Sequence, residues 1–318
     1  MVYLRITGRA IVNVHTANCE GAVGNYMSLS KMYIVRRVNG RVEVDEENVI
    51  SGNMLKHWHA VAYVERLKAE NYTKMCELCK RHVMYRSSLK LNDEFDYLEK
   101  CAVEDLHGFL DPDVQIRRES IARFSFMAPI EELPSHRSAV THNRVVTDTS
   151  GKISGEMMIM KREYASGIYG FACTFDLDYV GRSQSDPSKV LNATDRKIRS
   201  KCAVLALMDV FSGKMGAAQA RALPIIKVSE MLAVISKKPF PNLTHGFFQD
   251  YVEDSVDIIN AVLQAGLAKA DEVKVFCVGD RVSSTVEQRV SQKDVIVKCA
   301  NVADAIAKIA EVVEKWLA

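Results

Sequence analysis

Residues 2–15 read "VYLRITGRAIVNVH", and the alternation of their side chains decides the fold class. Apolar side chains occupy even positions, namely Val2, Leu4, Ile6, Ala10, Val12 and Val14. Polar side chains occupy odd positions, namely Arg5, Thr7, Arg9, Asn13 and His15. Because successive side chains of a strand point to opposite faces, this stretch predicts a long β-strand with one solvated face.

Further strands and helices follow without a strict alternation. Period-two patterns predict strands within 119–128, 157–163 and 168–179, and a short apolar run predicts a buried strand at 272–279. Helical spacing dominates 53–107, 192–211, 250–269 and the C-terminal segment. We therefore expect an α+β fold in which helices cover one face of an antiparallel sheet. Residues 131–156 form a long polar connection, which is typical of a functional or disordered segment.

The composition is that of a globular protein. The chain has 318 residues, of which 48% are apolar, and a formal net charge of +2. The small net charge argues against coating nucleic acid by bulk electrostatics. No apolar run approaches the roughly 20 residues of a membrane span, and the eight cysteines are too sparse for a disulfide framework. We expect a cytoplasmic protein without a membrane partner.

Residues 51–60, "SGNMLKHWHA", predict the start of a helix and carry two histidines. On a regular helix His57 and His59 lie roughly 200° apart, so they cannot bind one metal ion together. An amphipathic helix with histidines facing the solvent is the simplest interpretation.

The motif "CELCKRH" places Cys76 and Cys79 at the spacing of half a zinc site, with His82 nearby. A structural zinc ion needs four ligands, and a second cysteine pair is missing. We expect neighbouring semi-buried cysteines, and a metal-stabilised interaction module built on these three residues is the alternative. "GAVGNY" and "GKMGAAQAR" fit no phosphate-binding loop, so no cofactor is expected.

Polar patches in loops and at the ends of elements are the other notable feature. They are Asn18 in "HTANCEG", "GNMLKHWH", "THNRVV", "MKREYASG" and "GKMGAAQARALP". Each combines Lys, Arg, His or Asn with small residues, and such groups position phosphates and sugars without reading bases.

Seven ordered segments carry a family resemblance. They are "GRAIVNVHTANCEGAVGNY", "SGNMLKHWHA", "CAVEDLHGFL", "SIARFSFMAPI", "THNRVV", "MMIMKREYASGIYGF" and "GAAQARALP". From about residue 4 to about residue 225 the chain resembles the DevR-type backbone subunit of archaeal type I-A CRISPR surveillance complexes, within the RAMP superfamily.

The resemblance implies a single RNA-recognition-like, ferredoxin-type palm over 1–318, with a helical insertion at 51–107 and a protruding thumb at 131–156. It implies a non-catalytic protein that stacks into a helical filament along a CRISPR RNA, joins other subunits of the complex and presents the guide to target DNA. The implied RNA contacts are Asn18, Asn53, Lys56, His57, His59, His142, Asn143, Arg144, Lys161, Arg162, Lys214 and Arg221.

Two consequences of the resemblance are specific. "THNRVV" and "GAAQARALP" should converge on one RNA groove, where Gly216, Ala217 and Ala218 would let an RNA strand approach the backbone. Relatives in the same superfamily process CRISPR RNA with a histidine or tyrosine, so an endoribonuclease that uses His57, His59 or His142 is the alternative function.

Overall fold

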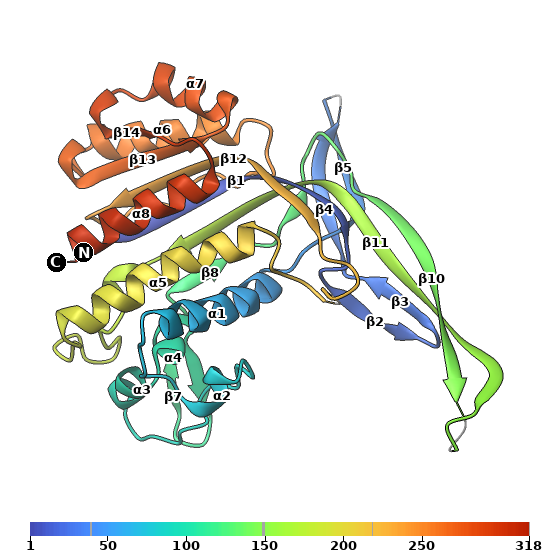
Figure 1. The fold of residues 1–318 in the computed structure, drawn as a ribbon. Coiled ribbons are helices and arrows are strands. Elements are labelled where there is room, and N and C mark those ends of the chain that lie inside the picture. Colours follow the sequence, from blue (N-terminus) through green and yellow to red (C-terminus); the bar gives the residue numbers. More distant parts are fainter. Residues whose placement is uncertain (39, 148–149, 218, 318) are drawn as a thin grey trace.

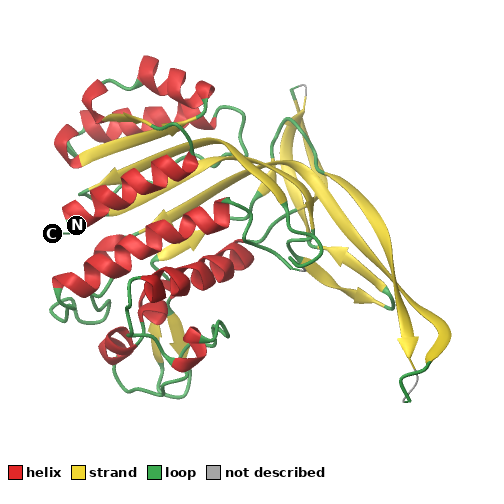
Figure 2. Cartoon of the chain, viewed as in Figure 1, coloured by secondary structure: helices red, strands yellow, loops and turns green. Residues whose placement is uncertain are grey.

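The computed structural model describes residues 1–38, 40–147, 150–217 and 219–317. A large sheet runs through the molecule, and a long hairpin extends from it (Figures 1 and 2). The strand order is β14-β13-β12-β1-β11-β3-β2, and β8, β9 and β10 also pair with β11. The principal strands are β1 (Tyr3–His15), β8 (Ala122–Phe124), β9 (Ala128–Pro129), β10 (His136–Thr147), β11 (Ile153–Phe175), β12 (Ile225–Ser236), β13 (Val273–Val278) and β14 (Ile296–Lys298).

The connectivity is that of a ferredoxin-type palm. Strand β1 is followed by helix α1 (Gly52–Ala69), strands β8 and β11, helix α5 (Ala193–Phe211) and strand β12. Strand β1 pairs antiparallel with β11 and β12, and β11 pairs antiparallel with β8. The α+β, RNA-recognition-like class is therefore confirmed. The parallel pairs β13–β14 and β11–β3 make the sheet mixed at its margins.

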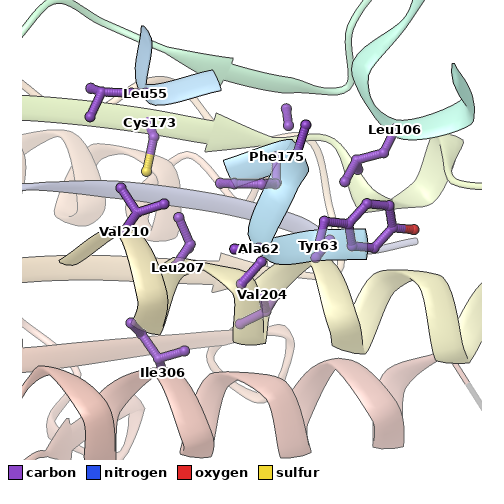
Figure 3. Close-up of a cluster of buried hydrophobic side chains, with 14 of the residues drawn as sticks. Leu55, Ala62, Tyr63, Leu106, Cys173, Phe175, Val204, Leu207, Val210 and Ile306 are labelled. Carbon is purple, nitrogen blue, oxygen red and sulfur yellow. The ribbon is translucent and has the colours of Figure 1, made fainter. Parts of the chain in front are cut away.

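Helices cover both faces of the sheet. On one face α1, α5 and α8 (Val302–Trp316) enclose a core that contains Tyr63, Phe175, Leu207 and Ile306 (Figure 3). On the other face α6 (Tyr251–Gln264) and α7 (Asp280–Arg289) pack on β12 and β13. The predicted coverage of one face was wrong, because the C-terminal third of the chain supplies a second layer.

The polar face of β1 is also buried, contrary to the prediction of a solvated face. The Arg5 and Arg9 side chains donate to the carbonyls of Phe240 and Gly246 at 2.9 Å, and Thr7 donates to the Thr244 carbonyl at 2.8 Å. The segment before α6 shields these three side chains from water, and its carbonyl groups accept the hydrogen bonds that water would otherwise accept.

Smaller elements follow β1 and α1. Residues 19–48 form two hairpins from β2 (Cys19–Val23), β3 (Tyr26–Leu29), β4 (Lys31–Val38) and β5 (Arg41–Asn48). After α1 come α2 (Glu77–Lys80), α3 (Glu94–Lys100), α4 (Ala102–His107), β6 (Phe109–Asp111) and β7 (Ile116–Arg118). Three 3-10 turns lie in the described chain, at Leu177–Tyr179, Ala270–Glu272 and Lys293–Val295. Within the predicted insertion 51–107, α1 packs on the sheet beside α5, whereas α2–α4 lie farther from it (Figure 1).

A buried ion network anchors the α3–α4 region. Arg118 pairs with Glu94 at 2.6 Å and with Asp105 at 2.8 Å, and Arg199 of α5 pairs with Asp105 at 2.8 Å. All of these side chains are buried, so each charge depends on its partners.

The β10–β11 hairpin occupies much of the segment predicted as the thumb. Strand β10 lies within 131–156 and pairs with the first half of β11, which extends away from the body (Figure 1). Residues 148 and 149 lie outside the described residues. Among the described residues, no helix combines the length and apolar character needed to cross a membrane.

Candidate nucleic-acid interface

The first candidate site is a cavity of about 370 Å³ at the start of α1. Ser51 caps the helix by accepting from the Met54 backbone N–H at 3.1 Å. Asn18 holds this cap, because its side chain donates to the Ser51 hydroxyl at 3.0 Å and accepts from the Ser51 backbone N–H at 2.8 Å. Asn18 and Asn53 both line the cavity.

Basic side chains are the charged groups of this cavity, which we call the α1 cavity. Lys56, His57 and Arg86 line it, and none of the described lining residues is acidic. Burial, and then the nearby charges of Arg86 and Arg123, lower the pKa of Lys56 to about 8. Arg86 donates to the His107 carbonyl at 2.8 Å, and neither Lys56 nor Arg86 forms an ion pair with a described residue. An anion entering the α1 cavity would therefore meet uncompensated positive charge.

His59 does not belong to the α1 cavity, and its predicted RNA contact was wrong. Its side chain is fully buried, with Nε2 2.8 Å from the Ala203 carbonyl and Nδ1 3.1 Å from His107. Burial lowers the pKa of His59 to about 4. The exposed His57 and the buried His59 thus confirm the predicted opposite orientations, but only His57 can reach a ligand.

The second candidate site, the hairpin cavity, has a volume of about 280 Å³. Its lining residues are His142, Met160, Arg162, Tyr164, Ala220 and Arg221. The structure brings His142 of "THNRVV" and Arg221 of "GAAQARALP" to the same cavity, and RNA binding there stays a prediction. His142 Nε2 lies 2.9 Å from the Tyr164 hydroxyl, and neither Arg162 nor Arg221 is ion-paired within the described part of the chain.

The hairpin register separates the other predicted residues. Arg144 lies opposite Met158 and His142 opposite Met160, so both share the face of the hairpin cavity. Asn143 lies opposite Ile159 and Lys161 opposite Thr141, which places them on the other face. The Lys161 ammonium lies 5.8 Å from the centre of the Tyr26 ring. One groove therefore cannot hold all the residues predicted from "THNRVV" and "MKREYASG".

The loop after α5 packs against Ala17, next to Asn18 of the α1 cavity, and its later residues Ala220 and Arg221 line the hairpin cavity. Gly216 has a φ of +92°, and a Cβ there would lie 3.0 Å from the Ala17 Cα. The Ala217 backbone N–H donates to the Ala17 carbonyl at 3.3 Å, and Ala218 lies outside the described residues. Gly216 and Ala217 thus pack against the protein's own backbone at residue 17, and the close approach of an RNA strand to this loop stays a prediction.

Lys214, in the same loop, is less available than predicted. Its ammonium lies 3.3 Å from Asp209, a carboxylate that also pairs with Arg66 at 2.6 Å. Sequence reasoning missed Arg86 and Tyr164, which line the two cavities. Tyr164 stands in the quoted "MKREYASG" segment, two residues after Arg162, and this position was a usable signal. Arg86 follows no periodic pattern.

Comparisons with known proteins agree on one group. A family model described as "CRISPR-associated negative auto-regulator DevR/Csa2" matches residues 6–256. The chain is similar to a "CRISPR-associated protein Cas7/Cst2/DevR" of Methanocaldococcus jannaschii, with 37% identity over 92% of this chain and 98% of the relative. A protein described in the same words in Thermoproteus tenax is 36% identical over 83% of each chain.

A solved structure shares the fold. A chain of a "CRISPR RNA-guided surveillance complex" matches with a TM-score of 0.51 and 9% identity, covering 98% of this chain and 99% of the other. At that identity the match supports the architecture alone.

Proposed function

We propose that this chain, which belongs to the DevR/Csa2 family of CRISPR-associated proteins, is a non-catalytic subunit that binds single-stranded CRISPR RNA. The observation that carries the proposal is the pair of cavities lined by cations and without acidic residues among those described. Lys56, Arg86, Arg162 and Arg221 form no ion pair with a described residue, so their charges are available to phosphates.

The chemistry of both cavities favours contact with the RNA backbone. Lys56, Arg86, Arg162 and Arg221 offer charge and hydrogen-bond donors, and Asn53 adds an amide. Such groups bind phosphate oxygens and 2′-hydroxyls and carry little sequence information. A protein that must accept any guide sequence needs this kind of contact, because base pairing supplies the specificity.

The hairpin supports the further proposal that copies of the chain stack along the guide. Its exposed apolar side chains are Val140, Val145, Ile153, Met157, Met158, Ile159 and Met160. Exposed apolar surface of this extent is typical of an interface, and a neighbouring copy would cover it. In this proposal the filament acts in the cytoplasm in a type I-A complex, with other subunits, and presents the guide to target DNA.

Binding and nuclease protection test the proposal together. The full chain is titrated with single-stranded RNAs of equal length and different base composition, and bound RNA is then digested with a nonspecific nuclease. We expect similar affinities for all sequences and protected fragments at regular length intervals. Binding restricted to one composition would contradict the backbone contacts, and unprotected RNA would contradict the filament.

One observation favours a second candidate, an endoribonuclease. His142 lies 2.9 Å from the Tyr164 hydroxyl and shares the hairpin cavity with two arginines. A histidine can transfer protons while cations stabilise the phosphate. Incubation of repeat RNA with the wild-type chain and His142→Ala, without added metal, separates the two functions. Specific cuts that His142→Ala abolishes would establish the nuclease, whereas intact RNA supports the backbone role.

A further inference from the structure

Three cysteines and one glutamate form a compact buried cluster outside the two cavities. The Sγ atoms of Cys76, Cys79 and Cys101 and a carboxylate oxygen of Glu104 all lie within 4.8 Å of one another. All four residues are buried. The cluster brings together the α2 and α4 segments, which also meet where the Ala102 backbone N–H donates to the Lys74 carbonyl at 2.9 Å.

The four residues repeat one spacing twice. Cys76 immediately precedes α2 and Cys79 lies within it, whereas Cys101 immediately precedes α4 and Glu104 lies within it. Each pair therefore has two intervening residues, as in zinc sites built from two Cys-x-x-Cys turns, with Glu104 in place of the fourth cysteine. The second pair escaped sequence reasoning because its last member is a glutamate.

The glutamate side chain is incompletely satisfied. One oxygen of Glu104 accepts from the Ser87 backbone N–H at 3.0 Å, whereas the other is buried and has no hydrogen-bond partner in the described structure. A buried oxygen without a partner is costly, and a metal ion bound among the three thiols would satisfy this one.

We propose that Cys76, Cys79, Cys101 and Glu104 bind one zinc ion. At a Zn–S distance of about 2.3 Å, tetrahedral geometry places two sulfur ligands about 3.8 Å apart, which fits the cluster. Three thiolates favour zinc over magnesium or calcium. An iron–sulfur cluster would hold its cysteines farther apart.

His82, the ligand considered from the sequence, is excluded from this site. Its Nε2 lies 2.8 Å from the Glu65 carboxylate, and its backbone φ of +62° ends the α2 turn. Cys101 takes the place that the motif "CELCKRH" suggested for His82. The zinc site is thus assembled from two segments that are separate in the sequence.

The zinc site would also position part of the α1 cavity. Glu104 binds the backbone of Ser87, the residue next to Arg86, and Arg86 donates to the His107 carbonyl at the end of α4. Val83, Met84 and Arg86 line the cavity. Loss of the ion should therefore displace Arg86 and weaken RNA binding, a consequence that rests on the proposed function.

Metal analysis of the full chain tests the site without RNA. Protein produced in zinc-supplemented medium should contain one zinc ion per chain, and a mercurial reagent that reacts with thiols should release it. Cys101→Ala should lose the zinc, whereas His82→Ala and Cys299→Ala should retain it. Zinc retained by Cys101→Ala, or lost in His82→Ala, would overturn the ligand assignment.

A thiol measurement on the wild-type chain covers the case in which Cys101→Ala does not fold. In the native protein all six buried cysteines should resist a thiol reagent, and a strong chelator should expose three of them, Cys76, Cys79 and Cys101. Absence of zinc from the wild-type chain, with no change on adding chelator, would overturn the proposal. RNA affinity is measured separately: a zinc-containing chain that binds no RNA would contradict the proposed function and leave the zinc site standing.

Discussion

Replacement of Arg162 and Arg221 by alanine should reduce the salt dependence of RNA binding by a calculable amount. Both guanidinium groups line the hairpin cavity, and neither is ion-paired with a described residue. If each neutralises one phosphate, removal of both makes the slope of log K against log salt shallower by about 1.4, because each contact to single-stranded RNA contributes about 0.7. Over a fourfold increase in salt, the wild-type chain should lose about sevenfold more affinity than the variant.

The assay is fluorescence anisotropy with a labelled single-stranded RNA at several salt concentrations. Arg289→Ala with Lys308→Ala is the matched control, because it also removes two positive charges but takes them from ion pairs with Asp257 and Asp304. The control should keep the wild-type slope. Equal slopes for the hairpin variant and the wild-type chain would refute the assignment of this cavity to RNA.

Three further predictions concern single residues. Because Lys56 has a pKa of about 8, its ammonium loses its proton as the pH rises, and RNA affinity measured by anisotropy should fall by up to about tenfold between about pH 7 and 9. Lys56→Arg should remove this pH dependence. A fall that persists in Lys56→Arg would exclude Lys56 as its cause. Asp105→Ala leaves Arg118 and Arg199 buried without this partner, and urea unfolding should show that the free energy of unfolding falls by about 3–5 kcal/mol. A fall below about 1 kcal/mol would contradict a stabilising role of the ion network. His59→Ala should lower the free energy of unfolding by about 2–4 kcal/mol in the same assay. It should leave the salt dependence of RNA binding unchanged, and a shallower salt dependence would show that His59 contacts RNA.

The alternation in β1 predicted which residues share a face, but it could not predict what covers each face. Val2, Leu4 and Ile6 enter the core as expected. Arg5 and Arg9 are equally buried, because carbonyl groups of residues 240 and 246 accept their hydrogen bonds. A polar face of a strand can be buried when a distant segment supplies its hydrogen-bond partners. The local alternation of side chains cannot predict that segment.

The hairpin illustrates the opposite difficulty. Residues 136–147 form a strand whose side chains are mostly exposed on both faces. A strand with two exposed faces has no period-two burial pattern, so its polar sequence suggested an irregular connection. The meeting of His142, in β10, with Arg221 was expected only from the family resemblance, because residues so far apart in the sequence meet only through the fold.

The most direct test of the central claim is crosslinking of the full chain to a uniformly labelled single-stranded RNA, followed by mass spectrometry of the attached peptides. RNA that follows the two cavities should crosslink to peptides containing His57, Arg86, Tyr164 or Arg221. Peptides from α6 and α7, on the far side of the sheet, should stay unlabelled. Crosslinks concentrated on α6 and α7 would contradict the account.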